Sequence, residues 1–224
     1  MATLGISSAT KTISVGLSAD GRLLAELTVS GKQAFTEDLA VYVQKIVNES
    51  GAKIDGIAAI SGPGAYSGLR GGLAFAKTFA QVNKVPLAAV STLHALACNL
   101  IGSGCLIAAV TDAAQDDRNF ALFRPRAGEA ERLTGDLVVS IEKICSLLSR
   151  IKGEVGITGN CDDIMAKVAE LNPGTKIRHD RLNVPSGFNV AAIGEKMIKE
   201  GKVSDPLKLA PTYSRNPVIK EFRT

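Results

Sequence analysis

The chain has 224 residues, of which 46% are apolar and 21% are charged, with 22 glycines and 8 prolines. This composition is typical of a globular protein and excludes a disordered or collagen-like chain, while the length suits one large domain or two small ones. The net charge of +4 permits contact with RNA but does not indicate a dedicated nucleic-acid-binding domain. Aromatic residues make up only 4% and tryptophan is absent, which argues against long stacking platforms for single-stranded nucleic acid.

The four cysteines are Cys98, Cys105, Cys145 and Cys161, and no two of them have the C-x-x-C spacing of a zinc ribbon or a thioredoxin site. Free cysteines in a chain with an ample core indicate a reducing compartment. The chain starts without the basic segment of a secretory signal, and polar residues interrupt its most apolar stretch, 85–110. We therefore expect a soluble cytoplasmic protein that does not contact membranes.

The first half of the chain predicts three strands followed by alternating helices and strands. Residues 4–7, 13–17 and 23–29 are rich in β-forming residues, and Ala19-Asp20-Gly21 is a hairpin-turn signal between the last two. The segments that follow are predicted as a helix at 34–50, a strand at 56–60, a glycine loop at 62–68, a helix to about 82, a strand at 86–90 and a helix at 92–101. The predicted order of elements is β-β-β-α-β-α-β-α.

The second half of the chain predicts the same order. Its predicted strands are 105–110, 118–123, 131–139, 155–158 and 176–178, and its predicted helices run to about 148 and over 162–171 and 189–199. Ser140 is the predicted N-cap of the first of these helices. Three antiparallel strands followed by alternating helices and strands build a mixed sheet with helices on both faces.

Two such units in tandem resemble the actin-like or ASKHA architecture of actin, sugar kinases and heat-shock proteins. This is an α/β fold of two ribonuclease-H-like units, and ligands bind in the cleft between them. The predicted division is an N-terminal actin-like domain at 1–103 with a dimerisation surface, a C-terminal actin-like domain at 104–203 and an extended basic tail at 204–224. A single α/β domain with accidental periodicity is the alternative.

The glycine loop between a strand and a helix is the strongest local feature. Gly62, Gly64 and Gly68 allow a tight turn with free backbone N–H groups, and Arg70 could add donors for an anion at the helix N-terminus. The loop is not a Walker A motif, because no lysine follows Gly68. From the spacing alone, we favour a turn whose glycines only let the helix pack closely.

The helix after this loop has an apolar surface wider than one sheet needs. Leu69, Leu73 and Ala76 lie on one narrow stripe, and Phe75 and Phe79 extend it to roughly 180°, whereas a helix on a sheet usually needs about 100°. This excess predicts a second buried surface. The surface could meet the neighbouring helix at 34–50 or another protein, and the sequence favours neither.

Carboxylates are scarce where a phosphotransferase of this architecture would hold Mg²⁺. The first strand ends in Ser7 and Ser8, whose hydroxyls are poor Mg²⁺ ligands, whereas the matching point of the second half keeps Asp112. Asp112 could hold a metal-bound water or pair with Arg118. No nucleophile elbow is present, and although Cys98 follows His94 at a spacing that could bind a metal, there is no third obvious ligand. The sequence therefore predicts no catalytic residue and no metal site.

Three motifs resemble the TsaB family. Residues 62–70, G-P-G-A-Y-S-G-L-R, match its hallmark G-P-G-S-F-T-G-[LI]-R with three conservative changes, residues 90–93 match V-S-T-L, and residues 211–215, P-T-Y-S-R, match P-x-Y-[LV]-R. The family also begins with I-D-T-[AS] and often carries D-A-R in its second half. Ser7 replaces the first aspartate and Ala114 replaces the arginine, which weakens the case for nucleotide binding by this chain.

The resemblance implies a non-catalytic scaffold in the complex that makes threonylcarbamoyladenosine in tRNA. Its partners would be the catalytic paralogue TsaD and the ATPase TsaE, with tRNA reached through the complex and a homodimer formed when the chain is alone. Thr92 and Leu96 stand where TsaD carries its metal-binding histidines. The complex would use ATP and Mg²⁺, and we expect no cofactor on this chain.

The resemblance also implies a partner surface on the first-half helices. The candidate interface residues are Phe35, Leu39, Tyr42, Val43, Ile46, Ala74, Phe75, Thr78, Phe79 and Val82. In the basic tail, Tyr213 and Arg215 are candidate site residues, and the tail's positive charges could help hold tRNA. The alternatives are a small-molecule kinase of the same fold, a peptidase, and a homodimeric protein without a role on tRNA.

Overall fold

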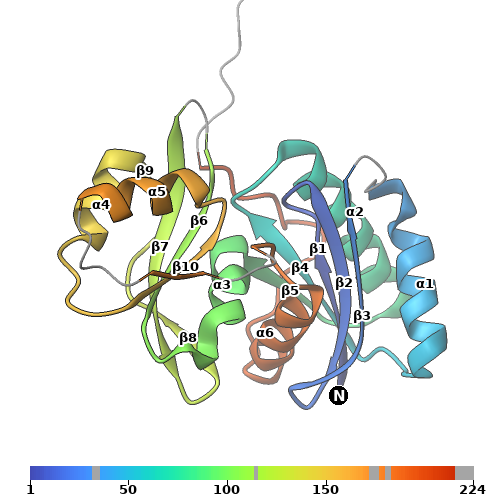
Figure 1. The fold of residues 1–224 in the computed structure, drawn as a ribbon. Coiled ribbons are helices and arrows are strands. Elements are labelled where there is room, and N and C mark those ends of the chain that lie inside the picture. The colour runs from blue at the N-terminus through green and yellow to red at the C-terminus, as the bar shows by residue number, and fades with distance from the viewer. Residues whose placement is uncertain (32–35, 114–115, 172–176, 180–182, 215–224) are drawn as a thin grey trace, which may run out of the picture.

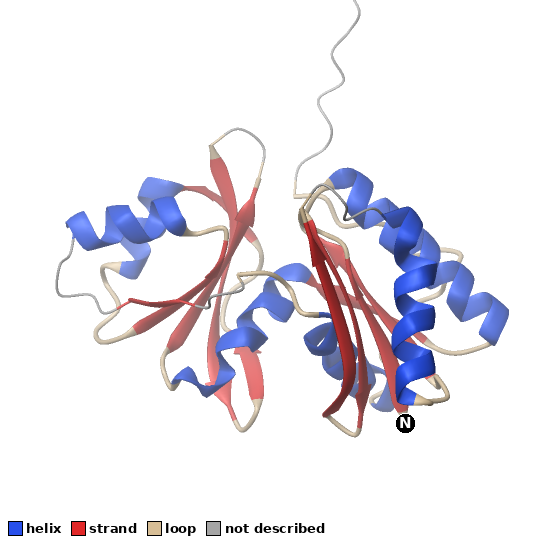
Figure 2. Cartoon of the chain, turned by 45° about the vertical axis from the view of Figure 1, so that its right-hand side comes forward, coloured by secondary structure: helices blue, strands red, loops and turns tan. Residues whose placement is uncertain are grey.

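A computed structural model describes residues 1–31, 36–113, 116–171, 177–179 and 183–214. Two lobes stand side by side, each built around one β-sheet, with helices on the faces of the sheets (Figures 1 and 2). The first-half elements are β1 (Ala2–Ser7), β2 (Thr12–Ala19), β3 (Arg22–Ser30), η1 (Thr36–Asp38), α1 (Leu39–Ser50), β4 (Gly56–Gly62), α2 (Tyr66–Asn83), β5 (Leu87–Ser91), α3 (Thr92–Ala97) and η2 (Cys98–Ser103). The predicted order of the first half is confirmed.

The first sheet has the strand order β3-β2-β1-β4-β5. Strands β1, β2 and β3 are antiparallel, whereas β1, β4 and β5 are parallel. Asp20 and Gly21, with φ of 51° and 73°, form the turn between β2 and β3. Two successive positive φ values are typical of the hairpin turn that the sequence predicts.

The second-half elements are β6 (Leu106–Asp112), β7 (Asp117–Arg126), β8 (Glu129–Arg132), β9 (Leu137–Ser140), α4 (Ile141–Leu148), β10 (Val155–Gly159), α5 (Asp162–Leu171), β11 (Ile177–His179) and α6 (Gly187–Lys199). Their sheet has the order β11-β10-β6-β7-β8, with β9 also pairing with β7. The single strand predicted at 131–139 is wrong, because it forms two strands. The turn-forming residues Thr134, Gly135 and Asp136 interrupt it, so β8 and β9 pair with different ends of β7.

Capping residues define the ends of two helices. The Ser140 hydroxyl accepts a hydrogen bond from the Lys143 N–H at 3.3 Å, which confirms the predicted N-cap of α4. Gly51, with φ of 62°, ends α1 in the left-handed conformation that C-cap glycines adopt.

Within the described ranges, no helix has both the length and the apolar character that a membrane crossing requires.

Helix α6 packs on the first sheet, although the sequence pattern groups it with the second half of the chain. It contacts β1, β2, β4 and β5, and Figure 1 shows it between the two lobes. Its approach is close enough to require glycines: a Cβ on Gly5 would lie 2.2 Å from the Gly187 carbonyl oxygen, and one on Gly194 would lie 2.1 Å from the Ala58 Cβ. The C-terminal half of the chain therefore completes the core of the first lobe.

A buried carboxylate ties α6 to the hairpin between β2 and β3. The Glu195 side chain is 3% exposed and accepts hydrogen bonds from the Ser18 hydroxyl at 2.8 Å, the Asp20 N–H at 2.9 Å and the Gly21 N–H at 3.3 Å. The Lys199 ammonium, one helical turn away, donates to it at 2.7 Å. A buried charge is tolerated when it is paired and hydrogen-bonded in this way.

Candidate functional site

The glycine loop packs against the connection between β1 and β2. A Cβ on Gly68 would lie 1.9 Å from the Ser8 carbonyl oxygen, and one on Gly64 would lie 2.5 Å from the Ala9 carbonyl oxygen. The Ser8 hydroxyl donates to the Gly68 carbonyl at 2.8 Å, and the Ala65 N–H donates to the Ala9 carbonyl at 2.8 Å. Close packing of α2 is thus sufficient to explain Gly64 and Gly68, as the spacing favours.

The candidate Mg²⁺ positions hold no free carboxylate. Ser7 is a buried serine in β1, and Asp112 at the end of β6 accepts hydrogen bonds from the Asn160 amide at 2.6 and 2.7 Å. The Arg118 guanidinium lies 3.6 Å from Asp112 and 2.6 Å from Asp163, so Asp112 pairs with Arg118. Among the described residues, no three His, Cys, Asp or Glu side chains gather into a metal site. These side chains do not fit the Mg²⁺ of a bound nucleotide.

The motif at residues 90–93 forms a link between the lobes. The Ser91 hydroxyl caps α3 by accepting from the His94 N–H at 3.4 Å, and it also accepts from the Arg132 guanidinium of β8 at 2.8 Å. The His94 ring stacks on Phe123 with centroids 5.6 Å apart, and burial, followed by the positive charge of Arg132, lowers the pKa of His94. The half-buried His94 ring therefore serves as a packing contact between α3 and β7.

Residues 204–214, which we call the C-terminal strap, run along the first lobe. The Ser204 N–H donates to the Leu87 carbonyl at 2.7 Å, the Lys77 ammonium donates to the Leu209 carbonyl at 2.9 Å, and the Thr212 N–H donates to the Ser61 carbonyl at 2.7 Å. A Cβ on Gly62 would lie 2.1 Å from the Thr212 carbonyl oxygen. The strap and the glycine loop therefore meet backbone to backbone.

This contact brings two of the three sequence motifs together. Tyr213 of the strap stacks on Tyr66 at the start of α2, with ring centroids 5.4 Å apart and planes at 23°. The Arg70 guanidinium lies 4.9 Å from the Tyr66 ring centroid and donates to the Tyr66 hydroxyl. Arg215, the other candidate of the tail, lies outside the described residues. We call Tyr66, Arg70 and Tyr213 the tyrosine platform.

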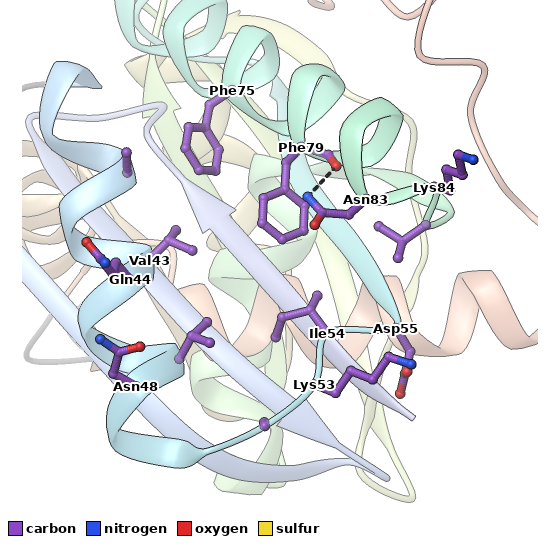
Figure 3. Close-up of a pocket in the computed structure, with 14 residues that line it drawn as sticks. Val43, Gln44, Asn48, Lys53, Ile54, Asp55, Phe75, Phe79, Asn83 and Lys84 are labelled. Carbon is purple, nitrogen blue, oxygen red and sulfur yellow. Dashed lines mark hydrogen bonds between the residues drawn. The ribbon is translucent and has the colours of Figure 1, made fainter.

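A groove of about 740 Å³ runs between α1 and α2. Figure 3 shows Phe75 and Phe79 extending from α2 into the groove, with Val43, Gln44 and Asn48 on the α1 side. The two phenylalanine rings are stacked with centroids 6.1 Å apart. The groove has an apolar floor and a polar rim; the floor consists of Val43, Val47, Ile54, Phe75, Phe79 and Val85, and the rim of Gln44, Asn48, Lys53, Asp55, Asn83 and Lys84.

The candidate interface residues divide by exposure. Leu39 and Ile46 are fully buried in the core of the first lobe, so they do not contribute to its surface, whereas Val43 is 5% exposed at the floor of the groove. Tyr42, Phe75 and Phe79 are half-buried, Ala74 and Thr78 are exposed, and Val82 is 73% exposed. Phe35 lies outside the described residues. Sequence patterns do not identify Ile54 or Val85, because only the fold brings these two segments beside α2.

Comparison with known proteins identifies relatives over almost the whole chain. Residues 22–200 match the family model TsaD, tRNA N6-adenosine threonylcarbamoyltransferase. The tRNA threonylcarbamoyladenosine biosynthesis protein TsaB of Bacillus subtilis is 26% identical over 96% of this chain and 94% of its own length. The protein of the same name from Escherichia coli is 26% identical over 97% of this chain and 96% of its own length.

Solved structures confirm the predicted fold class. A Pseudomonas aeruginosa protein, described as uncharacterized with similarity to peptidase YeaZ, superposes with a TM-score of 0.79 at 20% identity, covering 96% of this chain and 99% of that one. The ROK hexokinase of Thermus thermophilus superposes with a TM-score of 0.50 at 14% identity, covering 88% of this chain and 100% of that one. At these identities the likeness concerns the fold, which is the actin-like architecture predicted from the order of elements.

Proposed function

The chain belongs to the family of the tRNA N6-adenosine threonylcarbamoyltransferase TsaD, and we propose that it is a non-catalytic scaffold subunit of that enzyme's complex. Its curated relatives confirm the predicted resemblance to the TsaB family and support a role in the biosynthesis of threonylcarbamoyladenosine in tRNA. The proposal adds that the chain pairs with a catalytic TsaD homologue and, through that pair, with the ATPase TsaE. The observation that carries it is the groove between α1 and α2.

The interior of the chain supports a role without catalysis. Thr92 and Leu96, at the positions of the paralogue's metal-binding histidines, are fully buried, and neither side chain offers an imidazole. Asp112 is engaged by Asn160 and Arg118, and Ser7 supplies only a hydroxyl. We therefore propose that this chain holds no cofactor, that threonylcarbamoyl transfer to the adenosine beside the anticodon occurs on the paralogue, and that ATP and Mg²⁺ are used elsewhere in the complex.

The groove between α1 and α2 suits a helical partner of the same fold. An apolar floor surrounded by polar residues is the usual anatomy of a protein interface, and buried aromatic anchors such as Phe75 and Phe79 often carry much of the binding free energy. The partner we propose is the matching helix pair of the catalytic paralogue. A second copy of this chain presents the same surface, so the chain alone would form a homodimer through it.

Light scattering on a sizing column tests the proposal. The chain alone should elute as a homodimer, and mixing with the TsaD homologue should replace it with a one-to-one complex. Phe79→Asp should weaken both associations by at least about 30-fold, because a hot-spot residue contributes about 2 kcal/mol or more. Gln81→Asp, an exposed position on the same helix outside the groove lining, is the matched control and should leave both associations unchanged.

Other outcomes would favour other functions. Absence of any complex, with and without ATP and Mg²⁺, would refute the scaffold role. ATP turnover by the purified chain would favour the small-molecule kinase, and cleavage of casein would favour the peptidase. If the complex forms, a modification assay with the ATPase, tRNA, threonine, bicarbonate and ATP should require this chain. A homodimer that persists without any partner would favour the protein with no role on tRNA.

A further inference from the structure

The tyrosine platform is an unusual surface for a chain with so few aromatic residues. The whole chain has three tyrosines, and two of them, Tyr66 and Tyr213, are 53% and 37% exposed and stack on each other at the surface. Large apolar groups that remain exposed together often mark an interaction site. Tyrosine suits such a site because its ring is apolar while its hydroxyl remains hydrated.

Arg70 gives this surface a cation that is held in place. Its guanidinium lies over the Tyr66 ring and uses a donor on the Tyr66 hydroxyl. A guanidinium has five N–H donors in a rigid fork, so others remain for an anion. Because Arg70 is exposed at the surface, a phosphate can approach it from solvent.

The hydrogen-bonded segments that form the platform carry no acidic residue, although Thr36, which precedes Glu37 and Asp38, packs against Gly71 beside Arg70. Three segments meet here, 7–14, 61–72 and 209–214, through the hydrogen bonds of Ala65 with Ala9 and of Thr212 with Ser61. Together they contain Lys11 and Arg70 and no aspartate or glutamate. An exposed aromatic surface beside the Arg70 guanidinium complements a nucleobase and its phosphate better than an apolar protein segment.

The platform is also ordered before any ligand arrives. The bond from the Thr212 N–H to the Ser61 carbonyl holds Tyr213 against the glycine loop, and the close approach of Gly62 to Thr212 leaves no room for a side chain between them. A site held in its binding conformation loses less conformational entropy on binding. Two rings offer a place for one base, which agrees with the low aromatic content of the chain.

We propose that the tyrosine platform binds one unpaired nucleobase of single-stranded RNA, stacked on Tyr213, with Arg70 contacting a neighbouring phosphate. The inference rests on the proposed function, which brings tRNA to the complex. It adds a direct RNA contact on a subunit that has no catalytic role. The competing occupant is a protein segment, and the experiment distinguishes the two.

The test measures RNA binding by the complex of this chain with its TsaD homologue. The probe is a fluorescein-labelled anticodon stem-loop, followed by fluorescence anisotropy. Tyr213→Ala should weaken binding at least about fivefold, whereas Tyr213→Phe, which keeps the stacking surface, should stay within about twofold of the unmodified chain. Arg70→Gln should reduce the slope of log affinity against log salt by about 0.7, as expected for one lost phosphate contact with a single strand.

A further variant distinguishes the loss of stacking on Tyr213 from a loosening of the strap. Ser204→Pro removes the N–H that bonds to Leu87 at the far end of the strap, and leaves the platform and all charges in place. It should bind the probe normally. Equal affinities of Tyr213→Ala and the unmodified chain would overturn the inference, as would a loss in Ser204→Pro as large as that in Tyr213→Ala.

The remaining outcomes separate this inference from the proposed function. If Tyr213→Ala weakens association with the TsaD homologue or the ATPase and leaves RNA affinity unchanged, the platform is a protein contact and the inference fails. If no complex forms, the proposed function fails, and the same titration is made with the chain alone. RNA binding that depends on Tyr213 would then sustain the platform, and absence of such binding would overturn it.

Discussion

Replacing Glu195 by Gln tests how α6 is held on the first lobe. Gln has nearly the same shape as Glu, but it carries no charge and has one acceptor oxygen instead of two. In the structure, one carboxylate oxygen accepts from the Asp20 N–H and Lys199, and the other accepts from the Ser18 hydroxyl and the Gly21 N–H. The best orientation of a Gln amide turns its NH₂ group toward Ser18, whose hydroxyl can rotate to accept.

This orientation loses two favourable interactions, and together they give the expected loss of folding stability. The Gly21 N–H loses its acceptor, which costs about 1 kcal/mol, and the bond from Lys199 loses its charge assistance, which costs about another 1 kcal/mol. Glu195→Gln should therefore destabilise the chain by about 2 kcal/mol. Glu195→Ala loses all four bonds and leaves buried donors unpaired, so it should cost about 3–5 kcal/mol.

The assay is urea unfolding followed by tyrosine fluorescence. All three tyrosines, Tyr42, Tyr66 and Tyr213, lie in the first lobe or in the strap along it, so their signal reports on the lobe that α6 completes. Glu200→Gln is the matched control, because Glu200 is an exposed carboxylate on α6's C-terminal end that pairs with Lys196 and Lys202. Its unfolding midpoint should not change.

The pH dependence of the same transition gives a second measurement. Burial raises the pKa of Glu195, but the hydrogen bonds from Lys199, Ser18 and the Gly21 N–H together lower it below the ordinary value of 4.5. A lowered pKa contributes stability that is fully present above pH 4.5 and is lost as the pH falls through the folded-state pKa. The stability difference between the unmodified chain and Glu195→Gln should therefore shrink below pH 4.5. Equal urea midpoints at neutral pH, or a difference that persists in acid, would refute this account of Glu195.

Two further predictions concern the glycine loop and the second lobe. Gly68→Ala should destabilise the chain by about 2 kcal/mol or more in thermal unfolding, because its Cβ would lie 1.9 Å from the Ser8 carbonyl oxygen, whereas Gly135→Ala, which meets open space, should melt normally. Hydrogen bonding to Lys167 lowers the pKa of Glu142 to about 2. An NMR titration should find this low pKa, and Lys167→Met should return it toward 4.5; an unchanged pKa in that variant would exclude Lys167 as the main cause.

The order of elements could be predicted because its signals are local. The Asp20-Gly21 turn and the Ser140 cap each depend on a few adjacent residues, and each has the predicted conformation. The break between β8 and β9 is local as well. Leu133 and the apolar run at 137–139 conceal it, since residues with strand character stand on both sides of the turn-forming residues 134–136.

The position of α6 could not be predicted, since the information for it is shared between distant segments. The sequence predicts a helix at residues 189–199, but not which sheet that helix covers. The close contact of α6 with the first sheet requires glycine at three positions, Gly5 on β1 and Gly187 and Gly194 on α6. Nothing in the sequence around these glycines indicates that they will be in contact. Glu195 is similar, because a lone glutamate on a helix indicates solvent exposure unless its partners are known.

The candidate interface residues also show that sequence patterns do not predict which side chains are exposed. A wide apolar face on α2 predicts a second contact surface, yet helical spacing on α1 does not separate Leu39 and Ile46, which fill the core, from Val43, which lines the groove. Whether a side chain of α1 is buried or exposed depends on how deeply the fold places it against the sheet. Residues such as Ile54 and Val85 join the groove only because the segments before β4 and β5 end beside α2.

Helix α2 connects the two surfaces proposed for this chain. Its C-terminal half carries Phe75 and Phe79 into the groove, whereas its N-terminal turn carries Tyr66 and Arg70 in the tyrosine platform. The strap bonds to the C-terminal half of α2, at Lys77. A partner bound in the groove and RNA stacked on the platform would thus lie on one rigid helix of 18 residues, about 27 Å long at 1.5 Å per residue. Under the two proposals together, this helix would set the distance between the transferase and a single RNA base.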